Sequence, residues 1–104
     1  MKFRSLFIAH TPGADKEEHH VKLETDKYLL RVNLVKNQDE ALEVAKDMAK
    51  NEGIQSIILC PGFTHQNVAE ISQALDGVGV TVARGDGPSS RIAKEAMEKA
   101  GWFD

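Results

Sequence analysis

Strand-like and helix-like segments alternate along this chain from residue 28 onward, and that alternation limits the fold more than any other feature. In the strand-like segments the apolar residues recur at every second position or run together, whereas in the helix-like segments they recur three and four positions apart. Strands are expected at residues 3–9, 28–35, 56–60 and 78–83, and helices at 38–51, 65–75 and from 88. Strands that alternate with helices are typical of a mostly parallel sheet with right-handed crossovers. The sequence therefore predicts an α/β fold.

We expect a single domain over residues 1–104, with a four-stranded sheet and about three helices on its faces. The apolar runs at 3–9 and 56–60 indicate central strands that are covered on both faces. The regular alternation at 28–35 indicates a half-covered strand at an edge of the sheet. The expected spatial order is second, first, third and fourth strand. This order places the switch point, where ligands of open α/β sheets bind, between the first and third strands.

The segment at 14–27 has no firm assignment. Val21–Thr25 alternates like a short strand, and the turn-forming residues 25–27 would connect it to the strand that begins at residue 28. An antiparallel connection of this kind would make the sheet mixed rather than wholly parallel.

Capping residues delimit the expected helices. Asn37 is the expected N-cap of the first helix, with Glu40 reaching back as in a capping box. Thr64 is the expected N-cap of the second helix. Trp102, which follows the C-terminal Gly101, is expected to cover the apolar stripe of the last helix. The residues that this last helix is expected to bury are Ile92, Ala96 and Met97.

Composition and charge argue against several functions. The chain has a net charge of −3, and no segment collects lysine and arginine, so binding to nucleic acid is not expected. No stretch approaches the ~20 apolar residues of a membrane span. The single cysteine, Cys60, cannot form an internal disulfide, which favours a reducing compartment, and we expect the protein in the cytoplasm.

Polar loops follow three of the expected strands. Because the C-terminal ends of parallel strands meet at one edge of a sheet, these loops are expected to gather there and to form the functional site. Each loop combines turn residues with hydrogen-bond donors. The three loops are His10–Asp15, Cys60–His65 and Arg84–Arg91.

The loop after the last strand is the best candidate for binding an anion. Its glycines allow the backbone to approach a ligand, and its serines and the first amides of the following helix favour negative charge. Its arginines suit a phosphate or a carboxylate. The alternative is that Asp86 and the serines only cap the helix while the arginines are solvated. The candidate ligand-binding residues, two of them from the preceding loop, are Arg84, Gly85, Asp86, Gly87, Ser89, Ser90, Arg91, Gly62 and Thr64.

Cys60 is the candidate for a thiol nucleophile. It ends a central strand ahead of a helix whose N-terminus would favour the thiolate, and His65 or His10 would serve as its base. The alternative is a buried structural cysteine. No pair among the cysteine and the histidines has the spacing of a zinc motif, so no metal is expected, and the sequence assigns no cofactor.

The aromatic residues near the C-terminus bear on self-association. Together with Phe63, they are the candidates for exposed aromatic side chains. We expect Trp102 to pack in the core, whereas an exposed Phe103 would mark a surface for association. A small domain gains stability by associating, which favours a homo-oligomer.

The stretches Lys36–Ala41, Leu59–Phe63 and Val82–Arg84 resemble those of a family of small prokaryotic proteins that is catalogued as a domain of unknown function. The resemblance covers nearly the whole chain and implies an α/β domain of this length, with no assigned activity and no catalytic residue. In that family proline or glycine stands at the position of Pro61, and the last loop varies. The anion site in that loop is therefore not expected throughout the family.

Two functional hypotheses follow from these residues. The first is a binder or enzyme for a small anionic metabolite that carries a phosphate or a carboxylate, held at the C-terminal edge of the sheet. The second is a non-catalytic oligomeric interaction or regulatory module without a small-molecule ligand. An anionic ligand that stabilises the folded chain would distinguish the first from the second.

Overall fold

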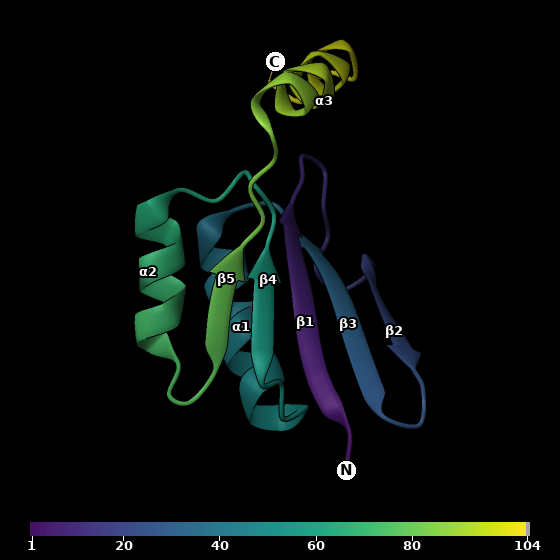
Figure 1. The fold of residues 1–104 in the computed structure, drawn as a ribbon, viewed down its shortest axis with the longest axis vertical. Coiled ribbons are helices and arrows are strands. Elements are labelled where there is room, and N and C mark those ends of the chain that lie inside the picture. Colours follow the sequence, from purple (N-terminus) through teal and green to yellow (C-terminus); the bar gives the residue numbers. More distant parts are fainter. Residues whose placement is uncertain (104) are drawn as a thin grey trace.

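A computed structural model describes residues 1–103, in which a single sheet of five strands is combined with three helices (Figure 1). The strands lie in the order β2-β3-β1-β4-β5, and all neighbours are parallel except β2 and β3, which are antiparallel. The order of the four parallel strands is the predicted one. In chain order the elements are β1 (Phe3–His10), β2 (His20–Glu24), β3 (Tyr28–Val35), α1 (Gln38–Asn51), β4 (Ser56–Leu59), α2 (His65–Ala74), β5 (Gly79–Val82) and α3 (Gly87–Lys99).

The fifth strand corrects the prediction of a four-stranded sheet. β2 pairs with β3 as a hairpin, and Thr25 makes the turn: its amide donates to the Tyr28 carbonyl over 2.8 Å, and its Oγ1 accepts from the Tyr28 amide over 3.1 Å. β2 therefore forms the edge of the sheet. β3 is the second strand from this edge, and its predicted position at the edge is wrong. The alternation in β3 reflects the difference between the two faces of the sheet rather than an edge position.

Helices α1 and α2 both pack on one face of the sheet, which we call the covered face (Figure 1). The connections from β3 to β4 and from β4 to β5 step in the same direction across the sheet, and right-handed crossovers then place both helices on the same side. The prediction that the central strands are covered on both faces is wrong for this reason.

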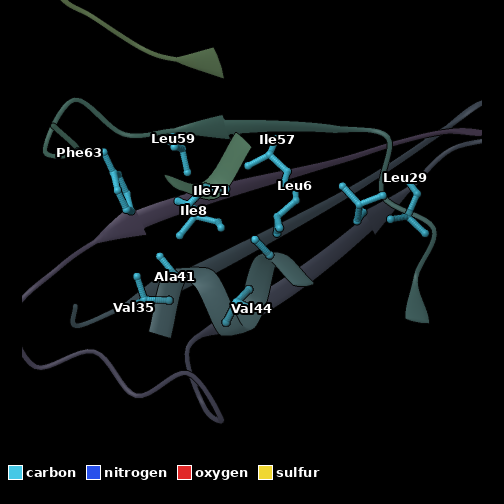
Figure 2. Close-up of a cluster of buried hydrophobic side chains, with 12 residues drawn as sticks. Leu6, Ile8, Leu29, Val35, Ala41, Val44, Ile57, Leu59, Phe63 and Ile71 are labelled. Atoms are coloured by element: carbon cyan, nitrogen blue, oxygen red, sulfur yellow. The ribbon is translucent and has the colours of Figure 1, made fainter. Parts of the chain in front are cut away.

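The hydrophobic core lies between the covered face and these two helices (Figure 2). Strands β1 and β4 contribute side chains with no exposed surface, and Phe63 closes the core at one end with 1% exposure. Burying an aliphatic side chain of this kind contributes about 1.5–3 kcal/mol to folding. The core residues labelled in Figure 2 are Leu6, Ile8, Leu29, Val35, Ala41, Val44, Ile57, Leu59, Phe63 and Ile71.

The opposite face of the sheet carries no helix in the described part of the chain, and we call it the open face. Figure 1 looks onto it. It is identified by the alternation of side chains along each strand and by the register of the strands. Its residues are Phe3, Ser5, Phe7 and Ala9 in β1, Val21 and Leu23 in β2, Tyr28, Leu30, Val32 and Leu34 in β3, Ser56 and Ile58 in β4, and Gly79 and Thr81 in β5.

The predicted helix caps are confirmed, with one difference. Asn37 Oδ1 accepts from the Glu40 amide over 2.9 Å, and Thr64 Oγ1 accepts from the Asn67 amide over 3.1 Å. Glu40 reaches back one residue further than a capping box requires, because its carboxylate accepts from the Lys36 amide over 3.0 Å.

Helix α3 stands beyond the strand ends, joined to β5 by an extended stretch at 83–86 (Figure 1). None of its residues is buried, and Ile92 is 67% exposed, so the predicted burial of Ile92, Ala96 and Met97 is wrong. The end of the helix does follow the prediction, because Gly101 has φ +82° and the Trp102 amide donates to the Met97 carbonyl over 3.0 Å. The predicted packing of Trp102 in the core is wrong, because its side chain is exposed. Helical spacing fixes which residues share a face, but it does not fix what that face contacts.

Candidate functional site

The C-terminal ends of β1 and β4 meet at the switch point of the sheet, as predicted. From this point the order of the strands runs in opposite directions, to β3 on one side and to β5 on the other. The His10 amide donates to Cys60 Sγ over 3.3 Å, and the Cys60 amide donates to the Ile8 carbonyl over 3.0 Å. The first two predicted loops therefore lie side by side.

Arg84 brings the third loop to the same edge. Its Nη1 donates to the Pro61 carbonyl over 2.9 Å, and its Nη2 donates to the Phe63 carbonyl over 3.0 Å. Both terminal nitrogens of the guanidinium are thus bonded to main-chain oxygens of the loop after β4. In this arrangement Arg84 braces the two loops, and its planar fork points at protein acceptors rather than at an open anion site.

A cleft of about 760 Å³ lies between these loops and α3. Its volume falls in the range of small-molecule sites. The loops form one side of the cleft, and α3 with the two aromatic residues after it forms the other. The lining residues are Ala9, His10, Thr11, Pro12, Lys36, Cys60, Pro61, Gly62, Ala93, Lys94, Met97, Trp102 and Phe103.

The side chains of the cleft are apolar or basic. Met97, Trp102 and Phe103 present an apolar wall, and the primary amines come from Lys36 and Lys94. Among the described lining residues none is acidic, although Glu40 Oε2 lies 3.8 Å from the Lys36 amine just outside. A cleft with basic groups and low-dielectric walls attracts anions.

The hypothesis of a nucleophilic Cys60 finds no paired base in residues 1–103. Nε2 of His10 lies 2.7 Å from the Lys36 carbonyl, and because a carbonyl only accepts, that nitrogen carries the proton. No histidine ring nitrogen in this part of the chain is hydrogen-bonded to Cys60 Sγ, and His65 is exposed at the start of α2. A catalytic role for these three residues stays a prediction.

The structure separates the predicted ligand-binding residues into groups. Gly62 lines the cleft, whereas Thr64 caps α2 as described above. At the start of α3, the Ser90 hydroxyl lies against Gly85, so a side chain at position 85 would require this hydroxyl to rotate away. Asp86 is the N-cap residue but makes no side-chain cap bond. Exposed residues of this group that do not line the cleft are Asp86, Gly87, Ser89, Ser90 and Arg91.

Several lining residues were missed in the sequence. Lys36 follows directly after β3, and because β3 is parallel to β1, its C-terminal end reaches the same edge. The same reasoning that found the other loops would have found this lysine. Lys94, Met97 and Phe103 depend on where α3 lies, and no sequence pattern specifies that position.

A second, smaller hollow of about 350 Å³ lies on the covered side between β3, α1 and the loop before β2. Arg31 Nη1 pairs with Glu52 over 2.8 Å, but Arg31 Nε and Asn33 Oδ1 are buried without a partner among residues 1–103. At its rim, a hydrogen bond to Glu43 raises the pKa of Lys16 above the ordinary value.

The described residues contain no group of three or more histidine, cysteine or acidic side chains placed to hold a metal ion. Residues 1–103 also include no helix with the length and apolar character needed to cross a membrane.

Comparison with known proteins gives one match. The model of a family of unknown function (DUF6506) matches residues 3–98. No curated protein and no solved structure matches the chain.

Proposed function

We propose a function for this chain, which belongs to the family of unknown function DUF6506: it binds a small anionic metabolite with an apolar body in the cleft at the C-terminal edge of the sheet. The observation that carries the proposal is the composition of the cleft. Two lysines and an apolar wall line it, and no acidic residue does within the described part of the chain. The position of the cleft at the switch point supports the same conclusion, because open α/β sheets bind their ligands there.

In this proposal the two ends of the ligand meet different parts of the cleft. A carboxylate or phosphate accepts charge-assisted hydrogen bonds from the amines of Lys36 and Lys94. The apolar body lies against Met97 and Trp102. Arg84 acts indirectly, because its two hydrogen bonds to the loop after β4 hold the chain that leads into α3.

The second candidate function, a non-catalytic oligomeric module, is favoured by a separate observation, the uncovered apolar face of the sheet. As a module without a small-molecule ligand it is an alternative to the first, and the ligand experiment below distinguishes the two.

Thermal unfolding with matched probes tests the ligand proposal. Phenylpropionate and phenyl phosphate should raise the melting temperature, and neutral phenylpropionamide at equal concentration should not. At ten times the Kd a ligand adds about 1.4 kcal/mol, which is on the order of 5 °C for a domain of this size. Equal stabilisation by the neutral amide would contradict the proposal.

Substitution of the lysines tests which residues bind the ligand. Lys94→Met should weaken binding of the anionic probes about 10-fold in calorimetric titration, because one charge-assisted contact is lost. Lys99→Met, on the same helix but outside the cleft, is the matched control and should leave the Kd unchanged. Equal effects of the two substitutions would argue against a defined anion site.

A further inference from the structure

We propose that the open face of the sheet is the interface of a homodimer, in which the open faces of two copies pack against each other. This surface shares only Ala9 with the lining of the cleft, and the proposal does not depend on a ligand.

The composition of the open face separates it from an ordinary solvated surface. Within residues 1–103, none of its strand residues carries a charge. Antiparallel and mixed sheets that keep one face in water normally alternate apolar with polar residues. Here the exposed fractions reach 62% for Leu23, 55% for Val21 and 36% for Ile58.

The register of the strands aligns apolar residues across the whole width of the face. Phe7 is level with Val32 on one side and with Ile58 on the other, and the row continues to the outer strands. This row is Val21, Val32, Phe7, Ile58 and Thr81. β-branched and aromatic neighbours of this kind form the inner faces of packed sheets.

The topology explains why the chain leaves this face without a helix. A right-handed crossover helix between β1 and β3 would lie on the open side, because that step runs opposite to the later ones. The chain instead forms the antiparallel strand β2 in this connection. Of the three helices in the described part of the chain, only α3 is not already placed on the covered face.

Helix α3 does not lie over the open face but stands beyond the strand ends (Figure 1). Arg84 fixes the chain ahead of it through the carbonyls of Pro61 and Phe63. Met97 and Trp102 already face the cleft at the strand ends. With α3 placed at that edge, the occupant that we propose for the face is a second copy of the same uncharged surface, packed about a two-fold axis.

The size of the face agrees with a dimer. Five strands about 4.8 Å apart and up to about 26 Å long give a surface of roughly 500 Å² in each copy. Two copies then bury on the order of 1,000 Å², which is at the lower end of specific interfaces. We expect a dimer with a micromolar Kd rather than an obligate one.

Sedimentation equilibrium tests the proposal. The full chain should be dimeric at 100 µM, and Ile58→Lys, in the middle of the face, should weaken association at least 100-fold. Val21→Lys lies on the exposed edge strand, where a lysine leaves the fold intact, and should weaken it at least 10-fold. Circular dichroism confirms that each variant is folded. A monomeric wild type, or a dimer that both variants leave unchanged, overturns the proposal.

Ile92→Lys is the matched control, because it places the same charge on an exposed apolar residue of α3. It should leave the dimer intact. Loss of the dimer in this variant would show that α3 covers the face of a partner, and this outcome also overturns face-to-face packing.

Discussion

The two faces of the sheet are built from the same strands, but the apolar side chains of one face are covered by helices and those of the other are not. On the covered face, α1 and α2 bury Leu6 and Ile8 completely, and the same face also holds the polar Arg31 and Asn33. On the open face the strand residues are uncharged, but no helix of the described chain lies over them. The face without an internal cover is thus the one without charge. This contrast is the basis for the dimer interface that we propose on the open face.

The largest expected effect is a loss of unfolding free energy, which should depend on protein concentration for a variant of the open face but not for one of the covered face. Ile8→Ala on the covered face should cost about 3 kcal/mol of unfolding free energy, because it leaves a cavity in the core. This loss should be the same at all protein concentrations. Phe7→Ala, the adjacent residue on the open face, should cost more at high than at low concentration, since part of its contacts form in the dimer. Urea unfolding at 2 and 200 µM measures both, and equal concentration dependence would remove the distinction.

A smaller effect concerns the buried polar residues of each face. Asn33→Leu on the covered face should be neutral or should stabilise by about 1 kcal/mol, because Asn33 Oδ1 has no partner among residues 1–103. Ser5→Ala on the open face should destabilise by about 1 kcal/mol, because the Ser5 hydroxyl is buried and hydrogen-bonded to the Tyr28 hydroxyl. Thermal unfolding of both variants gives the comparison. A large loss in Asn33→Leu would show that the amide is structurally required.

The smallest effect lies at the edge of the sheet. The hydrogen bond from Lys2 lowers the pKa of Glu24 below its ordinary value of about 4.5, and the Coulombic attraction of Lys2 acts in the same direction. The pKa of Glu24 is lower in the folded state than in the unfolded state. The pair with Lys2 therefore stabilises the fold fully at a pH above the unfolded-state pKa, and this stabilisation is lost as the pH falls through the folded-state pKa. Glu24→Gln should therefore narrow the difference in melting temperature between pH 7 and pH 3 by about 1 °C or less, as expected for an exposed pair. Glu98→Gln on α3 is the control, and an equal change there would exclude a specific role for Glu24.

Much of the fold was predictable because it depends on local patterns. The strand order, the caps at Asn37 and Thr64, and the meeting of the loops after β1 and β4 all follow from periodicity and from the right-handed crossover. β2 was only an alternating stretch in the sequence, since five exposed residues at an edge carry little apolar signal. The position of α3 was not predictable, because an amphipathic helix does not specify its partner.

The candidate site was predictable to the same extent. Loop positions follow from strand ends, so His10, Cys60 and Gly62 were found and Lys36 was within reach. The hydrogen bonds of Arg84 could not be predicted. An arginine beside glycines and serines suggests an anion site in a sequence, whereas in the structure its guanidinium donates to two carbonyl oxygens. Every residue has a main-chain carbonyl, so the sequence does not indicate which carbonyl accepts a side-chain hydrogen bond.

The brace formed by Arg84 has a consequence for how this chain tolerates change. Its two acceptors are peptide oxygens, which every amino acid supplies, so the side chain at position 61, which lines the cleft, can be exchanged without removing the attachment of α3, whereas Phe63 is fixed by its place in the core. The wall of the cleft is thereby anchored to the main chain of the loop that faces it and not to the side chain at position 61. Selection can alter the shape and polarity of one side of the pocket while the other side keeps its place.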